Sequence, residues 1–144
     1  MKLLFLAPEP FFQERGTPIA ARLALEVLAK RSASASERID FLTYNEGADV
    51  PLSGINHMRI FSPRALHGVG PGVSFKKLVC DAFFAFAVLK LVWTHRKDQY
   101  DLIHAIEESA FIAWLIKLLF GIPYIYDMDS SLSMQLVEKW PLLR

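Results

Sequence analysis

A histidine and two acidic residues follow an apolar run in the second half of the chain. His104 lies within Asp-Leu-Ile-His-Ala, and Glu107 and Glu108 come shortly after it. A histidine at this point either donates a hydrogen bond to a sugar or phosphate oxygen or is a satisfied residue of the core. Two adjacent glutamates suit the positive end of a helix that begins with them. They are also candidates for ligand binding, provided that the fold brings them to a ligand.

A second acidic cluster follows the next apolar run, where Asp127-Met128-Asp129 leads to Ser130. Such a carboxylate pair can hold a divalent metal through hard oxygen ligands. It also looks like the nucleophile motif of haloacid-dehalogenase-type phosphatases, with Asp127 attacking and Asp129 as acid and base. Those enzymes need further Ser/Thr, Lys and Asp elements far downstream, and only fifteen residues follow Asp129. We therefore expect no metal, and aspartates that cap the turn and bond a ligand hydroxyl.

The loop after the first apolar run is the third candidate. The run at 3–7 leads through a proline-rich stretch to Arg15-Gly16-Thr17-Pro18. A glycine just ahead of a helix leaves backbone N–H groups free at the positive end of the helix dipole. Gly16 and Thr17 are therefore candidates for binding an anion such as phosphate. The loop lacks G-x-G-x-x-G, so we expect no nicotinamide or flavin cofactor.

The order of the elements predicts how these three stretches meet. Apolar runs without polar alternation are typical of strands buried on both faces of a parallel sheet. We expect a doubly wound, Rossmann-like α/β domain with strand order 3-2-1-4-5 and helices on both faces. The expected strands are 3–7, 39–44, 58–61, 100–105 and 123–127, and the expected helices are 19–30, 75–97, 107–120 and 131–140.

In this topology the carboxyl ends of strands one, four and five are neighbours. Ligands of such folds bind at this edge, at the switch point between strands one and four. The sequence therefore places the candidate residues together. They are Gly16, Thr17, His104, Glu107, Glu108, Asp127, Asp129 and Ser130.

The first helix has a broad apolar pattern. We expect Thr17 to be its N-cap and Pro18 its first residue. Arg22, Glu26 and Lys30, spaced i, i+4, favour the solvated side. The expected buried face consists of Ile19, Ala20, Leu23, Ala24, Val27 and Leu28.

A second long helix is expected to begin after Ser74 as its cap. It is apolar nearly all round. This pattern fits a core helix with an interdomain face. The alternative is an interfacial surface for a lipid-linked acceptor, with cations at the helix ends. Those cations are Lys76, Lys77, Arg96 and Lys97.

Composition excludes several classes of function. The 144 residues fit one domain, 1–144, and 53% of them are apolar, which predicts a large core or an apolar exterior. A net charge of +1 gives no case for nucleic acid. The single cysteine, Cys80, lies in an apolar helical pattern and is expected in the core, so a reducing compartment is the default. We expect no membrane span and a cytoplasmic protein, with a peripheral contact to the inner membrane face left open.

Taken in order, three segments give the chain a family resemblance. They are Phe-Leu-Ala-Pro-Glu-Pro with Arg-Gly-Thr-Pro at 5–18, Tyr-Asp-Leu-Ile-His-Ala at 100–105, and Pro-Tyr-Ile-Tyr-Asp at 123–127. The chain resembles the N-terminal, acceptor-side domain of family 4 glycosyltransferases, which have the two-domain GT-B architecture. Family members commonly carry a second histidine two residues after the first, where this chain has Ile106 followed by Glu107.

The resemblance implies transfer of a sugar from a nucleotide-sugar donor to a hydroxyl of a sugar or lipid-linked acceptor, with no cofactor and no required metal. It implies that His104 and its neighbours contact the transferred sugar and that Gly16 and Thr17 approach phosphate or acceptor. We name His104 and Asp127 as the candidate catalytic residues. Such enzymes bind the nucleotide-sugar with a second, C-terminal domain, which the 144 residues do not include. We therefore expect the chain alone to be inactive. The alternative is a non-enzymatic binding or assembly module with the same fold.

Overall fold

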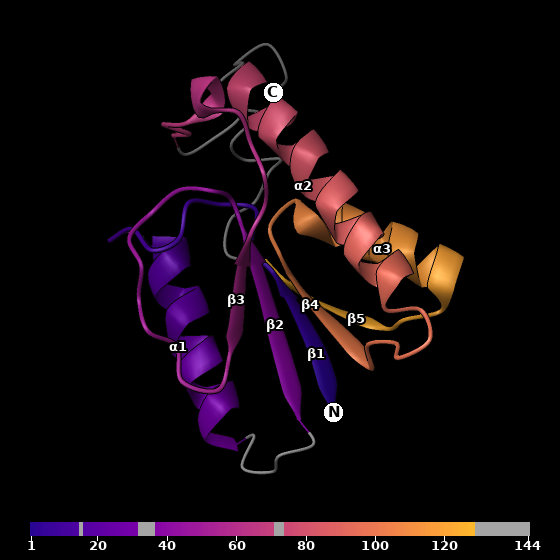
Figure 1. Cartoon of the computed structure of the whole chain (residues 1–144). Helices are drawn as coiled ribbons and strands as arrows, with labels where there is room; N and C mark the ends of the chain where they lie inside the picture. The colour runs from indigo at the N-terminus through magenta and orange to yellow at the C-terminus, as the bar shows by residue number, and fades with distance from the viewer. Residues whose placement is uncertain (15, 32–36, 71–73, 129–144) are drawn as a thin grey trace, which may run out of the picture.

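The computed structural model describes residues 1–14, 16–31, 37–70 and 74–128, which form a five-stranded parallel sheet with helices packed on it (Figure 1). The strand order is β3-β2-β1-β4-β5, as predicted. The elements are β1 (Lys2–Leu6), α1 (Gly16–Arg31), β2 (Arg38–Thr43), β3 (Asn56–Arg59), the short 3-10 helix η1 (Arg64–Leu66), α2 (Phe75–Thr94), β4 (Leu102–Ile106), α3 (Ser109–Phe120) and β5 (Tyr124–Asp127).

Several predicted boundaries were wrong by a few residues. The strand β3 pairs with residues 40–43 of β2, so it covers 56–59 and not 58–61. The helix α2 ends at Thr94, before the predicted Lys97, because the N–H of His95 closes the last turn on the carbonyl of Leu91. The helix expected over 131–140 lies outside the described residues.

The core consists of two clusters that use alternate residues of the central strand. Leu3 and Phe5 of β1 pack in one cluster with residues of α1, whereas Leu4 and Leu6 pack in the other with residues of α2 and α3. Successive side chains of a strand point to opposite faces of the sheet. The unbroken apolar run at the start of the chain is therefore buried on both of its faces.

The predicted buried face of α1 was correct only in part, since Ala24 and Leu28 are half-buried against the core. Pro18, Ala21 and Leu25 are buried, whereas Ile19, Leu23 and Val27 are exposed. The helix is apolar around most of its circumference, so periodicity alone did not identify the side that contacts the sheet. Two of the three polar residues predicted along one side of the helix contact each other, since Arg22 and Glu26 form an i, i+4 ion pair of 2.9 Å.

Other local predictions were confirmed. The hydroxyl of Ser74 accepts a hydrogen bond from the N–H of Lys77 and caps α2. Cys80 is buried in the core, and burial raises the pKa of its thiol. Gly121 ends α3 in the left-handed conformation, with φ of 74°.

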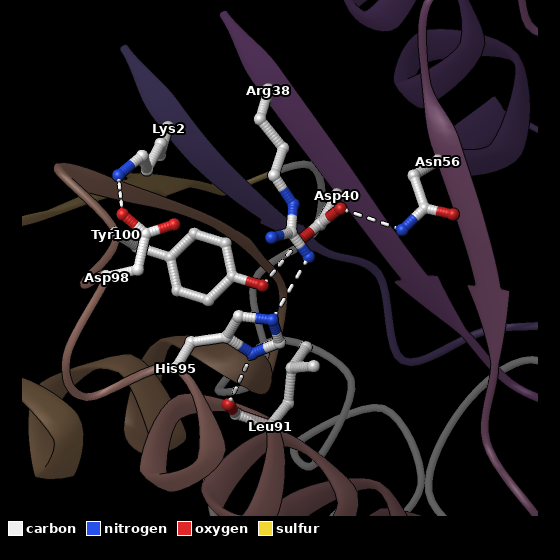
Figure 2. Close-up of polar contacts among 8 residues, drawn as sticks. All are labelled: Lys2, Arg38, Asp40, Asn56, Leu91, His95, Asp98 and Tyr100. Carbon is white, nitrogen blue, oxygen red and sulfur yellow. Dashed lines mark hydrogen bonds and ion pairs between the residues drawn. The ribbon is translucent and has the colours of Figure 1, made fainter.

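A buried carboxylate organises the amino edge of the sheet. Asp40 of β2 is fully buried and forms an ion pair of 2.6 Å with Arg38. Its two oxygens also accept hydrogen bonds from the Tyr100 hydroxyl at 2.5 Å and from the Asn56 amide at 2.8 Å (Figure 2). This group joins β2 to β3 and to the segment before β4. A buried charge is tolerated because all of these donors face it.

The same network fixes a histidine at the end of α2. The Nε2 atom of His95 lies 3.2 Å from the Arg38 guanidinium, and its Nδ1 atom lies 2.9 Å from the carbonyl of Leu91 (Figure 2). A guanidinium only donates and a carbonyl only accepts. In these contacts Nε2 accepts and Nδ1 donates, so His95 connects α2 to the Asp40 carboxylate through Arg38.

We predict that Asp40→Asn lowers the free energy of unfolding by about 2 kcal/mol, because Arg38 and the Tyr100 hydroxyl lose their charged partner. Burial raises the pKa of Asp40, but the bonds from Arg38, Tyr100 and Asn56 outweigh it and the net pKa is lowered. Its stabilisation is therefore present above about pH 4 and is lost as the pH falls through the lowered pKa. Urea unfolding followed by circular dichroism, at neutral and acid pH, measures both effects.

Asp49→Asn is the matched control for this prediction. Asp49 pairs with Arg59 at 2.9 Å, but its side chain is 95% exposed. The change is expected to alter stability by less than about 0.5 kcal/mol. Equal losses in the two variants would contradict the role given to Asp40.

Candidate functional site

The carboxyl edge of the sheet brings together stretches that are far apart in sequence. His104 is in register with Phe5 of β1 on one side and with Ile125 of β5 on the other. Asp127 is in register with Ile106, so it lies diagonally across from His104. The loops that follow β1, β4 and β5 therefore leave the sheet at one edge.

His104 and Asp127 face each other across two neighbouring strands. The Nε2 atom of His104 lies 3.4 Å from Oδ2 of Asp127, and the two side chains are 18% and 48% exposed. The imidazole also packs on the ring of Phe5, with 4.3 Å between the ring centroids. The apolar strand thus holds the ring in place, while the carboxylate at the strand end remains accessible to a ligand.

Thr17 and Glu107 make the second contact at this edge. The hydroxyl of Thr17 donates to Oε1 of Glu107 at 3.4 Å, which joins the start of α1 to the end of β4. Thr17 is not the N-cap that we predicted, because α1 already begins at Gly16. Gly16 itself has open space where a side chain would lie, so no local contact requires a glycine there.

Glu107 has a backbone conformation that is unusual for its residue type. Its φ is +50°, and its N–H bonds the carbonyl of Asp127 at 3.2 Å. Residues other than glycine seldom adopt the left-handed region, and those that do cluster at functional sites. We predicted that Glu107 and Glu108 begin the next helix, but α3 begins at Ser109. The backbone turns at Glu107 before the helix begins, so both glutamates precede the first residue of α3.

Glu108 contacts α2. Its carboxylate forms an ion pair with Lys77, a residue whose side chain is only 14% exposed. The same Nζ atom donates to the carbonyl of Pro8 at 3.3 Å and lies 5.8 Å from the centre of the Tyr44 ring. Lys77 therefore connects the loop after β1 with the loop after β4.

A second buried pair lies beside Lys77. The hydroxyl of Tyr44, the residue after β2, donates to the carboxylate of Asp81 on α2. Burial raises the pKa of both groups, and the charge of Glu107 raises each further. The bond from Tyr44 and the charge of Lys77 lower the pKa of Asp81, but they do not offset its burial.

Sequence reasoning did not find Lys77, Tyr44 and Asp81. The sequence pattern indicates for Lys77 only a cation at a helix end, and it assigns no role to Asp81. The available signal was their i, i+4 spacing on the helix side that also carries Cys80 and Phe84. Charged residues on a buried helix face require polar partners. Only the fold identifies Tyr44 as the partner of Asp81.

The loop after β1 is held by the loop after β2. Gly47 has a φ of +104°, and a Cβ atom at this residue would lie 2.3 Å from the carbonyl group of Phe11. The guanidinium of Arg59 donates to the carbonyls of Phe11, Gly47 and Ala48 at 3.0, 3.1 and 3.0 Å. These contacts fix the segment that leads into α1 and its Thr17.

Two further predicted residues, Asp129 and Ser130, lie outside the described residues. Within the part of the chain that the structure describes, no group of three or more His, Cys, Asp or Glu side chains is arranged to hold a metal ion. A hollow of about 420 Å³ lies elsewhere, between the second half of α1 and residues 51–55.

Comparison with known proteins adds no assignment. No family model matches the chain, and no curated protein matches it.

We predict that Gly47→Ala lowers the free energy of unfolding by about 3 kcal/mol, because the new methyl group meets backbone atoms of Phe11 and the φ is unfavourable for alanine. Gly54→Ala is the matched control. Gly54 also has a positive φ, +76°, but nothing lies within 4 Å of its Cβ direction. That change should cost about 1 kcal/mol. Thermal and urea unfolding measure the difference, and equal losses would show that the close approach to Phe11 is unimportant.

We predict that Asp81→Asn makes the protein more stable at neutral pH, because the amide still accepts the Tyr44 bond without a buried charge. The raised pKa means that the folded state binds the proton more tightly than the unfolded state. The carboxylate therefore lowers stability as the pH rises from about 4 through the raised pKa, and the variant removes this loss. Urea unfolding as a function of pH measures the change in slope.

Asp98→Asn is expected to act in the opposite direction. The exposed Asp98 has its pKa lowered by the bond from Lys2, so its charged form is favoured in the folded state. If Asp81→Asn destabilised the protein at neutral pH as Asp98→Asn does, the cost that we assign to the buried Asp81 charge would be wrong.

Proposed function

We propose that this chain forms the acceptor-side domain of a family 4 glycosyltransferase with GT-B architecture. The observation that supports this most is the meeting of three distant stretches at the switch point between β1 and β4. Thr17 contacts Glu107, and His104 faces Asp127, at the edge where ligands of doubly wound folds bind. This agrees with the family resemblance of the same three segments.

In the proposed reaction, a hydroxyl oxygen of the acceptor forms a bond to the anomeric carbon of the donor sugar. The bond from that carbon to the diphosphate oxygen breaks, and the nucleoside diphosphate leaves with the electron pair. The hydroxyl proton passes to a base or to solvent. His104 and Asp127 would contact the transferred sugar, while Gly16, Thr17 and Glu107 would contact phosphate or acceptor. A donor-binding domain would hold the nucleotide.

Asp129 and Ser130 belong to the same proposal as residues that bond a ligand hydroxyl. Glu108 has another role in this proposal, because its carboxylate already forms an ion pair with Lys77. We infer that Glu108 positions the loop after β4 and that Lys77, which contacts both loops, would attract an anion bound at this edge. A buried lysine beside two loops is well placed to attract phosphate oxygens.

A binding or assembly module of the same fold is the second candidate. The observation that favours it is the number of large apolar side chains that α2 and α3 expose. Extended apolar patches on a protein surface mark sites of interaction with another molecule. Such a module would use the same fold without turnover.

A titration with sugar nucleotides separates the two candidates. We expect UDP-glucose or GDP-mannose to shift the amide NMR signals of Gly16, Thr17 and residues 104–107 and 127. Asp127→Asn should weaken that binding by about fivefold or more, as expected when a ligand loses one hydrogen bond to a charged group.

Asp101→Asn is the control for the titration. Asp101 is an exposed carboxylate at the opposite edge of the sheet, where it accepts the N–H of Lys2 at 2.6 Å. The change should leave the binding of the sugar nucleotides unaltered. Shifts confined to surfaces other than the carboxyl edge of the sheet would favour the binding module and contradict the transferase.

A further inference from the structure

The helices α2 and α3 expose a continuous series of large apolar side chains, which we call the outer surface. On α2 these residues are three, eight and seven positions apart, close to whole turns of the helix, and on α3 they share one side of the helix. The members of the outer surface are Phe75, Leu78, Phe86, Trp93, Phe111, Trp114, Leu115, Leu118 and Leu119.

The two helices turn these residues to the same side of the molecule. The buried residues of α2, such as Phe84, and those of α3, such as Ala113 and Ile116, belong to one core cluster against the same side of the sheet. Their opposite sides therefore both face away from the sheet (Figure 1). The rings of Trp93 and Phe120, 6.2 Å apart, connect the two helices.

The exposed charged residues within α2 and α3 are cations, and the exposed Asp98 that follows Arg96 and Lys97 is paired with Lys2. Lys90 and Lys117 are exposed among its apolar residues, and Arg96 and Lys97 are exposed just beyond the end of α2. Among the described residues of α2 and α3, none of those that are exposed is acidic. The guanidinium of Arg96 lies 4.8 Å from the ring centre of Trp93. Tryptophan and long cations together are typical of surfaces at the boundary between lipid and water.

We propose that the outer surface binds the face of an anionic lipid bilayer, with α2 and α3 lying on the membrane. The apolar side chains would enter the boundary between headgroups and acyl chains, and the four cations would contact the lipid phosphates. Among the described residues, none of the helices combines the length and the apolar character needed to cross a membrane.

Charge complementarity favours a membrane over a second copy of this chain. Two outer surfaces that met face to face would bring lysines of the same sign together in a desolvated contact. An anionic bilayer instead supplies the opposite charge along the whole surface. The proposal does not depend on the proposed sugar transfer, because none of the carboxyl-edge residues Thr17, His104, Glu107 and Asp127 belongs to the outer surface.

Vesicle sedimentation tests the proposal with the full 144-residue chain. We expect the protein to sediment with vesicles that contain phosphatidylglycerol and to bind pure phosphatidylcholine vesicles much more weakly. Leu118→Asp should weaken binding by about tenfold or more, because it removes a leucine that would enter the bilayer and adds a charge that the anionic lipids repel. Lys117→Glu should reduce the preference for phosphatidylglycerol.

The α1 helix offers a matched control. Leu23 is 58% exposed and Leu118 is 64% exposed, but Leu23 lies on α1, outside the outer surface. Leu23→Asp should leave binding to the vesicles unchanged. Far-UV circular dichroism checks that both variants remain folded, which is expected because both sites are exposed.

Three results would overturn the proposal. One is no sedimentation with either vesicle. Another is equal loss in the two aspartate variants, which would indicate nonspecific adsorption. The third is a dimer in light scattering that Leu118→Asp dissociates while vesicle binding is absent, which would assign the outer surface to a second copy of the chain.

Discussion

The hydrogen bonding of β1 to strands on both sides decides where every polar residue of the candidate site lies. Because β1 is central, β2 and β4 align with it in parallel and their loops emerge at the same edge. Its side chains are buried on both faces, so a shift of one residue would exchange the two core clusters. The register of β1 is therefore fixed, and the pairing of β4 with β5 then sets the distance between His104 and Asp127.

The buried carboxylates at the two edges of the sheet differ in how many hydrogen-bond donors face them. At the amino edge, Asp40 has enough donors for its charged form to be favoured despite burial. At the carboxyl edge, Asp81 has fewer donors, and burial keeps its pKa high. Glu107 adds a strained backbone at the same edge. Buried charges with too few hydrogen-bond donors, and strained backbone, are typical of functional sites. A site with only a structural role would supply the donors that a buried charge needs.

The apolar residues of the chain are divided between the core and the exposed surface. Some of them form the two core clusters, and the rest lie exposed on α1, α2 and α3. The exposed part is not uniform. On α2 and α3 it is accompanied by exposed cations and no exposed acidic residue, whereas α1 carries the ion pair of Arg22 with Glu26 besides its exposed Lys30 and Arg31. The α2 and α3 face is therefore the one that suits an anionic surface.

The sequence by itself determined the strand order and the edge at which Thr17, His104, Glu107 and Asp127 meet, because parallel topology follows from uninterrupted apolar runs separated by helices. It also determined the caps at Ser74 and Gly121, which depend on neighbouring residues only. Only the tertiary structure decided which side of α1 is buried, since a helix that is apolar nearly all round fits a sheet in several orientations. It alone joined Lys77 to Glu108 and Tyr44 to Asp81, because contacts between residues far apart in sequence depend on the packing of α2 against the sheet.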